Sequence, residues 1–139
     1  MPEPTFDAVA AAAELDQAGP ADIVRVALEQ FSPALTISFS GAEDVALIAM
    51  AHETGIPFRV FSLDTGRLHP ETLEFIEQVR MHYAITIDAY SPQADAIEQL
   101  VRAKGLFSFY QDGHEECCSI RKVDPLRHAL ADVRAYITG

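Results

Sequence analysis

The chain has few cysteines, few basic residues and no long apolar stretch. Its two cysteines, Cys117 and Cys118, are neighbours among 139 residues, so they offer no disulfide framework. No apolar run approaches the roughly 20 residues of a membrane-spanning helix. Residues 1–4 carry neither the basic stretch nor the apolar run that begins a signal peptide. These absences predict a cytoplasmic protein in a reducing compartment, without membrane contact.

Basic residues are outnumbered, with 10 lysines and arginines against 21 acidic residues and a net charge of −11. This balance argues against nonspecific nucleic-acid binding, which needs a broad cationic surface. Half of the basic residues lie in one stretch: Arg102, Lys104, Arg121, Lys122 and Arg127. Such a cluster suits a small anionic ligand, because the nearest charges dominate at short range. It also suits ordinary solvated charges on helix faces.

Length and apolar content indicate one folded domain with a substantial core, since 49% of the residues are hydrophobic. Apolar periodicity and turn residues predict helices at 6–15, from Pro20 to about residue 30, and at 43–53, 70–83 and 95–104. A further helix carries the cysteines, and Pro125 either kinks it or begins a new one. Strands are expected at 35–39, 58–62, 85–88 and 134–138, and an aromatic-rich loop at 106–113.

Alternation of strands and helices predicts an α/β fold with a mainly parallel sheet covered by helices on both faces. Ligands of such sheets bind at the carboxyl ends of the strands. Those ends lie at residues 38–41, 63–67, 88–91 and 138–139.

The turn after the first strand is a candidate anion site. A strand runs through Ser38 into Ser40 and Gly41, and a helix follows directly. Backbone N–H groups at a helix N-terminus, together with hydroxyls, can receive an anion. With one glycine and no lysine, the turn matches neither of the common phosphate-binding motifs. An ordinary strand-to-helix turn with a serine cap remains an alternative.

The second strand leads into another candidate segment, which holds Thr65, Gly66 and Arg67. Thr65 and Gly66 can bring the backbone close to a ligand, and Arg67 can face an anion. His69 is a candidate acid or base, although a lone loop histidine is more often a surface residue.

The cysteine pair is followed by two cations, Arg121 and Lys122. Neighbouring cations stabilise thiolates and suit an anionic metal–sulfur centre. Two thiols cannot complete a site of four ligands, and only His114 lies near enough in sequence to be a local ligand. Two buried, inert thiols remain the alternative.

Four segments occur together in an order that resembles assimilatory adenylyl-sulfate (APS) reductases. They are Ser38-Phe39-Ser40-Gly41-Ala42-Glu43-Asp44, Leu63-Asp64-Thr65-Gly66-Arg67-Leu68-His69-Pro70-Glu71-Thr72, Gly105-Leu106-Phe107-Ser108-Phe109-Tyr110 and Cys117-Cys118-Ser119-Ile120-Arg121-Lys122-Val123-Asp124-Pro125-Leu126. The resemblance covers residues 21–139 and leaves residues 1–20 as an expected N-terminal helical extension. It implies a Rossmann-like, adenine-nucleotide α-hydrolase-like domain.

The resemblance also implies roles for particular residues. The turn at 40–44 resembles a modified pyrophosphate loop, with Ala42 at the second glycine and Val45 at the final serine of SGGxDS. Cys117 and Cys118 match two of the four ligands of a 4Fe–4S cluster, and Lys122 matches a supporting lysine between cluster and substrate. The expected substrate-binding residues are Ser38, Ser40, Gly41, Ala42, Glu43, Asp44, Leu63, Thr65, Gly66, Arg67, Arg121, Lys122 and Gly139.

The implied reaction reduces APS to sulfite and AMP with thioredoxin or a similar thiol donor. Its catalytic cysteine and the second pair of cluster ligands would follow Gly139, so we expect this chain to be the N-terminal part of the enzyme and inactive alone. Two other functions stay open: a 3′-phosphoadenylyl-sulfate (PAPS) reductase and a catalytically inactive adenine-nucleotide-binding module. No nucleic-acid partner is expected, and a homo-oligomer remains open.

Overall fold

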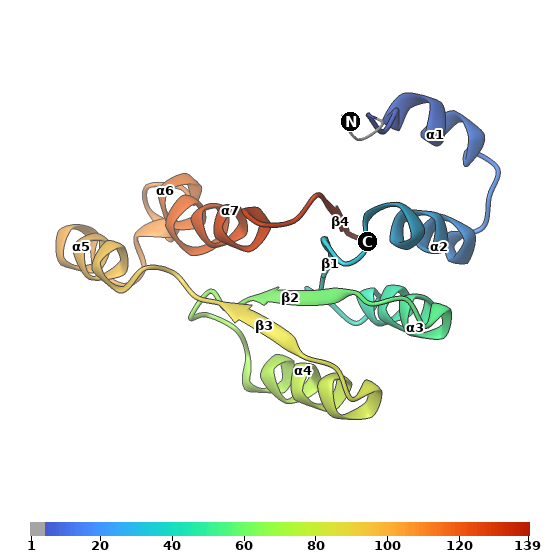
Figure 1. Ribbon diagram of the computed structural model, residues 1–139. Coiled ribbons are helices and arrows are strands. Elements are labelled where there is room, and N and C mark those ends of the chain that lie inside the picture. Colours follow the sequence, from blue (N-terminus) through green and yellow to red (C-terminus); the bar gives the residue numbers. More distant parts are fainter. Residues whose placement is uncertain (1–4) are drawn as a thin grey trace.

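A four-stranded sheet lies at the centre of the computed structural model, which describes residues 5–139 (Figure 1). Its strands are β1 (Leu35–Ser38), β2 (Arg59–Leu63), β3 (Ile87–Tyr90) and β4 (Ala135–Ile137). All pairs are parallel, in the spatial order β3-β2-β1-β4. The chain therefore builds outward from β1 to β3 and then returns to the other side of β1. Such a reversal opens a crevice at the carboxyl ends of the strands, where ligands of parallel sheets bind.

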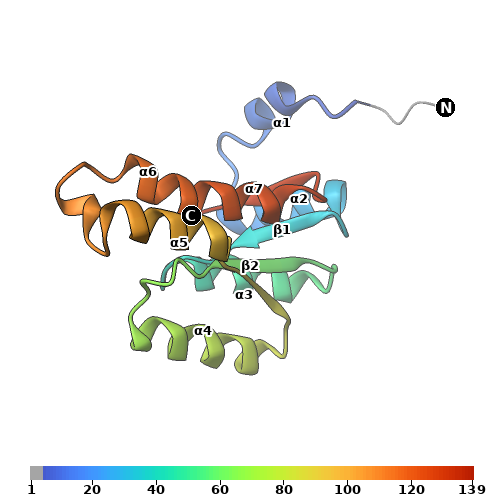
Figure 2. The same cartoon turned by 90° about the vertical axis from the view of Figure 1, so that its left-hand side faces the viewer.

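Helices cover both faces of the sheet, which confirms the α/β prediction. On one side lie α2 (Pro20–Phe31), α3 (Asp44–Thr54) and α4 (Pro70–Tyr83). On the other lie α5 (Ala94–Lys104), α6 (Glu115–Cys118) and α7 (Asp124–Leu130), which pass in front of the sheet in Figure 2. The short helix α1 (Ala8–Glu14) stands apart from these layers in both views.

The main core lies between the sheet and the layer of α2, α3 and α4. Alternation along β1 sends Leu35 and Ile37 to this face, and both are fully buried. Register aligns Ile37 with Val60 of β2, which in turn pairs with Ile87 of β3. Each buried aliphatic side chain contributes about 1.5–3 kcal/mol, so this row fixes which way the strands face.

The helix boundaries follow local chemistry. Pro20 and Pro70 stand at the first positions of α2 and α4, where a missing N–H costs nothing. Gly55 ends α3 with a left-handed φ of 70°, as the sequence predicted. The first helix is shorter than expected, because the Asp7 side chain accepts from Ala10 N and starts α1 at residue 8.

The structure differs from the sequence predictions in two further places. The third strand begins at Ile87 rather than residue 85, because Ile85 N donates to Arg80 O at the end of α4. The expected loop at 106–113 contains a 3₁₀ turn at Ser108–Tyr110, in which Tyr110 N donates to Phe107 O. Backbone hydrogen bonds at the helix ends, invisible to apolar periodicity, decide both cases.

The segment that carries the cysteines is not one uniform helix. After α6, residues Ser119–Val123 form a π-helix (η2), and α7 follows without a break. Pro125 is the second residue of α7 and stands in its first turn, where its missing N–H is tolerated. No helix within residues 5–139 combines the length and apolar character needed to cross a bilayer.

Candidate functional site

Three cavities meet at the carboxyl ends of β1 and β2, and Thr65 lines all of them. The loop pocket, about 270 Å³, is lined by Ser38, Phe39, Ser40, Ser62, Leu63, Thr65, Leu68, Thr72 and Lys122. The thiol cavity, about 510 Å³, is lined by Thr65, Arg67, His69, Tyr110, His114, Cys117, Cys118, Arg121 and Lys122. The apolar cavity, about 550 Å³, is lined by Thr65, Gly66, Arg67, Pro92, Ala94, Ile97, Glu98, Val101, Leu106, Phe107 and Arg121.

The loop pocket begins at the turn after β1. There the Asp44 carboxylate accepts hydrogen bonds from N–H and O–H groups of the turn that could otherwise bind a ligand. Asp44 is 3% exposed, and its Oδ2 accepts from Ser40 N (2.7 Å), Ser40 Oγ (3.0 Å) and Gly41 N (3.1 Å). Two of the amides that the sequence offered to an anion therefore hold an internal carboxylate. The turn is thereby fixed, and Ser40 Oγ presents its lone pairs because its proton points at Asp44.

Gly139 lies at the same place, two residues after the end of β4. A Cβ built on Gly139 would meet Asp44 Oδ1 at 2.6 Å, closer than real Cβ contacts. The parallel pairing of β1 with β4 brings together these residues, which are far apart in the sequence. Only glycine fits here while the Asp44 carboxylate stays in position.

The turn after β2 is organised by its own side chains. Gly66 N donates to Asp64 Oδ1 (3.0 Å), and Arg67 N donates to Thr65 Oγ1 (3.1 Å). Gly66 has a φ of 74°, a left-handed conformation that favours glycine. The Arg67 guanidinium donates to Leu106 O and lies over the Phe107 ring, 5.6 Å from its centre. This anchoring directs Arg67 along the aromatic segment.

Both thiols line one cavity, although neighbouring side chains on an α-helix point in directions about 100° apart. Cys117 and Cys118 are partly buried, free cysteines at the junction of α6 and η2. Cys118 N donates to His114 O at 2.7 Å. The cavity thus presents two thiols together with the cations of Arg121 and Lys122.

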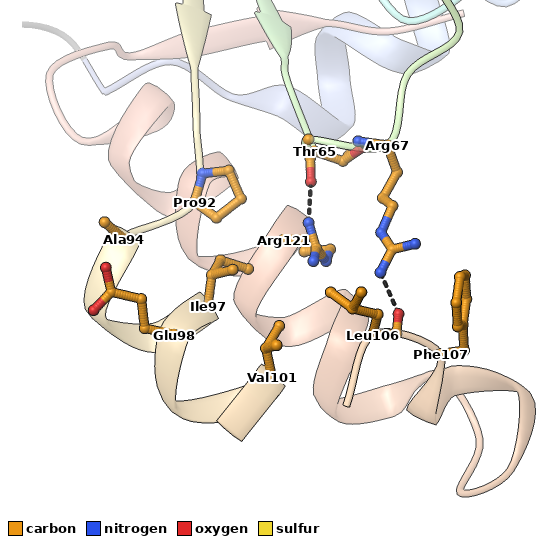
Figure 3. A pocket seen from close by; sticks show the side chains of 11 residues that line it. Thr65, Arg67, Pro92, Ala94, Ile97, Glu98, Val101, Leu106, Phe107 and Arg121 are labelled. Atoms are coloured by element: carbon orange, nitrogen blue, oxygen red, sulfur yellow. Dashed lines mark hydrogen bonds between the residues drawn. The ribbon is translucent and has the colours of Figure 1, made fainter. Parts of the chain in front are cut away.

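Arg121 is the buried cation of this region, with 8% of its surface exposed. Its Nη1 donates to Thr65 O at 2.6 Å, and a Cβ on Gly66 would lie 3.1 Å from the same nitrogen. Its Nε is buried and has no hydrogen-bond partner among the described residues. Figure 3 shows the guanidinium below Thr65, among the side chains that line the apolar cavity.

The structure does not bring all of the predicted cations together. Arg102 lies beside Asp95 and Glu98 on α5, away from the thiols. Lys104 Nζ lies 2.6 Å from Glu116 Oε2 and ties α5 to α6. This hydrogen bond raises the pKa of the Lys104 ammonium, and the charges of Glu116 and Asp112 add to the effect.

Two predicted residues of the β1 turn, Ala42 and Glu43, are exposed. Other lining residues were missed by the sequence analysis: Ser62, Leu68 and Thr72 in the loop pocket, and Tyr110 in the thiol cavity. The alternation of β2 could have indicated Ser62, since it shares a strand face with Val60. The 3₁₀ turn places Tyr110 at the thiol cavity, and the apolar periodicity of the sequence did not predict this turn.

Within residues 5–139, no three side chains among histidine, cysteine, aspartate and glutamate are arranged to hold a metal ion. The thiols of Cys117 and Cys118 are therefore the soft-metal donors that the thiol cavity offers. These suit two corners of an iron–sulfur cluster, whose usual complement is four cysteine thiolates.

Curated relatives of high similarity carry reductase names. The adenosine 5′-phosphosulfate reductase of Pseudomonas aeruginosa (strain LESB58) is 58% identical over 134 residues, which is 96% of this chain and 50% of that protein. The chloroplastic 5′-adenylylsulfate reductase 1 of Arabidopsis thaliana is 57% identical over 128 residues, which is 92% of this chain and 28% of that protein. The chain thus spans half or less of the length of these relatives.

Among solved structures, the phosphate complex of phosphoadenylyl-sulfate (PAPS) reductase from Candida auris has the same fold. Its TM-score is 0.76 at 21% sequence identity, over 96% of this chain and 68% of that one. The family model described as the phosphoadenosine phosphosulfate reductase domain matches residues 34–139. This match extends from the residue before β1 to the end of the chain and includes all three cavities. The chain belongs to the phosphoadenosine phosphosulfate reductase domain family.

Proposed function

We propose that this chain is the nucleotide-binding part of an assimilatory APS reductase, an oxidoreductase that reduces adenylyl sulfate to sulfite and AMP. The observation that carries the proposal is that the loop pocket and the thiol cavity share two residues, Thr65 and Lys122. A ligand in the loop pocket would therefore have its reacting end beside the thiols. The high identity to proteins named APS reductases supports the same substrate.

The loop pocket would hold the adenosine part of the nucleotide rather than the anion that the sequence suggested for this turn, because Asp44 Oδ2 occupies the N–H groups of Ser40 and Gly41. Its walls mix apolar and hydroxyl side chains, with Leu63 and Leu68 beside Ser38, Ser40 and Thr72. Such a lining suits a base and a ribose, which need apolar contact together with a few hydrogen bonds. The other expected binding residues of the turn, from Gly41 to Asp44, and Gly139 would form the end of this pocket near β4.

Lys122 would bind the anionic end of the substrate. Its side chain lines both spaces, so an ammonium there can screen the sulfate while a thiolate approaches and the leaving phosphate as charge develops. Arg67 and Arg121 add positive charge on the thiol side. Cations fixed at the point where charge develops lower the barrier for attack on an anionic group.

Cys117 and Cys118 would supply two of the four thiolate ligands of a 4Fe–4S cluster. When bound, such a cluster supplies a fixed charge and redox-active iron next to Lys122. Because these thiols act as ligands, the attacking thiolate would come from a part of the enzyme beyond these 139 residues. It forms a sulfur–sulfur bond to the sulfate, the sulfur–oxygen bond to AMP breaks, and AMP leaves with the electron pair.

A thiol donor such as thioredoxin would complete the turnover. Its thiolate attacks the enzyme cysteine, sulfite leaves, and a mixed disulfide forms between donor and enzyme. A second donor thiol then resolves this bond, so the donor is oxidised to a disulfide while the sulfate group is reduced to sulfite.

The test uses the anaerobically purified chain in two assays. Calorimetry measures the binding of AMP, and a second assay measures APS-dependent sulfite release with a thiol donor. We expect AMP to bind and sulfite to be absent, since the proposed nucleophile lies outside these residues. Visible absorption of the same sample reports any iron–sulfur centre. No binding of AMP or APS would contradict the proposal, and sulfite release would assign the nucleophile to Cys117 or Cys118.

Competition between APS and PAPS for the chain tests the alternative substrate. Among the described residues that line the loop pocket, Lys122 is the only cation, so they offer no second cationic side chain to bind a 3′-phosphate. We expect APS to compete at least as well as PAPS. Clearly tighter binding of PAPS would favour the PAPS reductase instead.

A further inference from the structure

The backbone of Lys122 must be held in place, because a lysine side chain is flexible and its ammonium must lie between two cavities. Its backbone belongs to η2, a π-helix of five residues. π-Helical turns are rare and persist mostly at functional sites, where other contacts hold them in place. The position of Lys122 therefore depends on what fixes this segment.

The neighbouring residue, Arg121, supplies a contact to a distant element. Its Nη1 donates to Thr65 O at 2.6 Å, across 56 positions of sequence. Arg121 is 8% exposed, whereas Lys122 is exposed and lines the loop pocket and the thiol cavity. The two adjacent cations therefore have different surroundings: one is packed inside and the other faces the ligand space.

The turn after β2 is shaped to receive this guanidinium. Gly66 approaches it so closely that a Cβ there would lie 3.1 Å from Arg121 Nη1. Burying a guanidinium without a carboxylate partner is costly, and Arg121 Nε has no hydrogen-bond partner among the described residues. Stability alone does not explain such a residue, because an apolar side chain of similar size would fill the space at lower cost.

We propose that Arg121 is a positioning residue that fixes η2 against the carbonyl of Thr65 and so holds Lys122 at the junction of the two cavities. It acts through Lys122 and does not bind the ligand itself, which differs from the role that the sequence suggested. This inference rests on the proposed function, because it assumes that Lys122 receives the phosphate of an adenine nucleotide.

The experiment compares AMP with adenosine, which lacks the phosphate, by calorimetry on the full chain. Four variants are needed: Arg121→Lys, Lys122→Ala, the double variant, and Arg127→Lys as an exposed control on α7. We expect wild type to bind AMP roughly tenfold more tightly than adenosine, the size of one charge-assisted contact. Lys122→Ala should remove this difference.

Arg121→Lys keeps the charge but loses the planar guanidinium that reaches Thr65 O. It should weaken AMP binding roughly fivefold to tenfold and leave adenosine binding within about twofold of wild type, and in the Lys122→Ala background it should cost nothing further. The control variant should match wild type for both ligands. Melting temperatures of all variants show whether each one is folded.

Each other outcome has a distinct meaning. Equal losses for AMP and adenosine in Arg121→Lys would mean that Arg121 shapes the whole pocket, and additive losses in the double variant would mean that it contacts the phosphate. Either result, or unchanged AMP binding in Arg121→Lys, overturns the inference and leaves the proposed function standing. A wild-type chain that binds neither ligand overturns the proposed function and this inference with it.

Discussion

Replacing Asp44 by alanine tests whether an internal carboxylate organises the turn after β1. Asp44 Oδ2 accepts three hydrogen bonds, from Ser40 N, Ser40 Oγ and Gly41 N, and the residue is 3% exposed. A hydrogen bond to a charged group contributes about 1.5–3 kcal/mol, but three bonds to one oxygen do not add in full. Since Ser40 is exposed, water can satisfy part of what is lost.

We therefore expect Asp44→Ala to lower the free energy of unfolding by about 2–4 kcal/mol. The matched control is Glu43→Ala, which removes the same charge from the same helix end at an exposed site. Helix-dipole effects alone are worth about 0.3–1 kcal/mol, so the control should lose no more than that. Asp44→Asn should lie between the two, because its single carbonyl oxygen accepts without the charge.

The assay is urea denaturation followed by far-ultraviolet circular dichroism, with all variants at one protein concentration. The variants should share the slope of wild type and differ in their midpoints. If Asp44→Ala and Glu43→Ala lose the same free energy within about 0.5 kcal/mol, the carboxylate does not hold the turn, and the reasoning fails.

Three further changes test other parts of the fold. Leu28→Ala should cost about 2–5 kcal/mol in urea denaturation, because Leu28 is 0% exposed in the main core; a loss below about 1 kcal/mol would contradict the packing. Gly66→Ala should lower the melting temperature more than Gly113→Ala. Both glycines have a positive φ, but of the two only Gly66 has a close neighbour, since its Cβ would lie 3.1 Å from Arg121 Nη1. Equal shifts in melting temperature would contradict this close contact. Glu116 raises the pKa of the Lys104 ammonium, so the stabilisation from this pair is complete below the unfolded-state pKa and is lost as the pH rises through the folded value. Lys104→Met should therefore speed hydrogen exchange in α6 at neutral pH and converge with wild type in strong alkali, whereas equal rates at neutral pH would mean that the pair does not hold α6.

Periodicity and turn residues in the sequence predicted the elements of the fold with small errors. Prolines at helix starts and Gly55 at a helix end act on neighbouring backbone, so their effect can be read from nearby residues alone. The errors arose where a backbone group forms a hydrogen bond with a neighbouring element. For example, Ile85 N donates to Arg80 O, and β3 therefore begins later than predicted. The π-helix after the cysteines was also missed, because no side-chain pattern distinguishes it from a continuing α-helix.

The candidate site divides in the same way. Sequence alone determined which chemistry is present, namely two adjacent thiols, the two cations after them and a serine–glycine turn behind a buried strand, because residue identities carry that information. Tertiary structure decided how these groups are used. Parallel pairing of β1 with β4 brings Gly139 to Asp44, and packing of η2 against the turn after β2 buries Arg121 while leaving Lys122 exposed. The physical reason is that burial and hydrogen-bond partners depend on contacts between distant segments, which only the folded sheet creates.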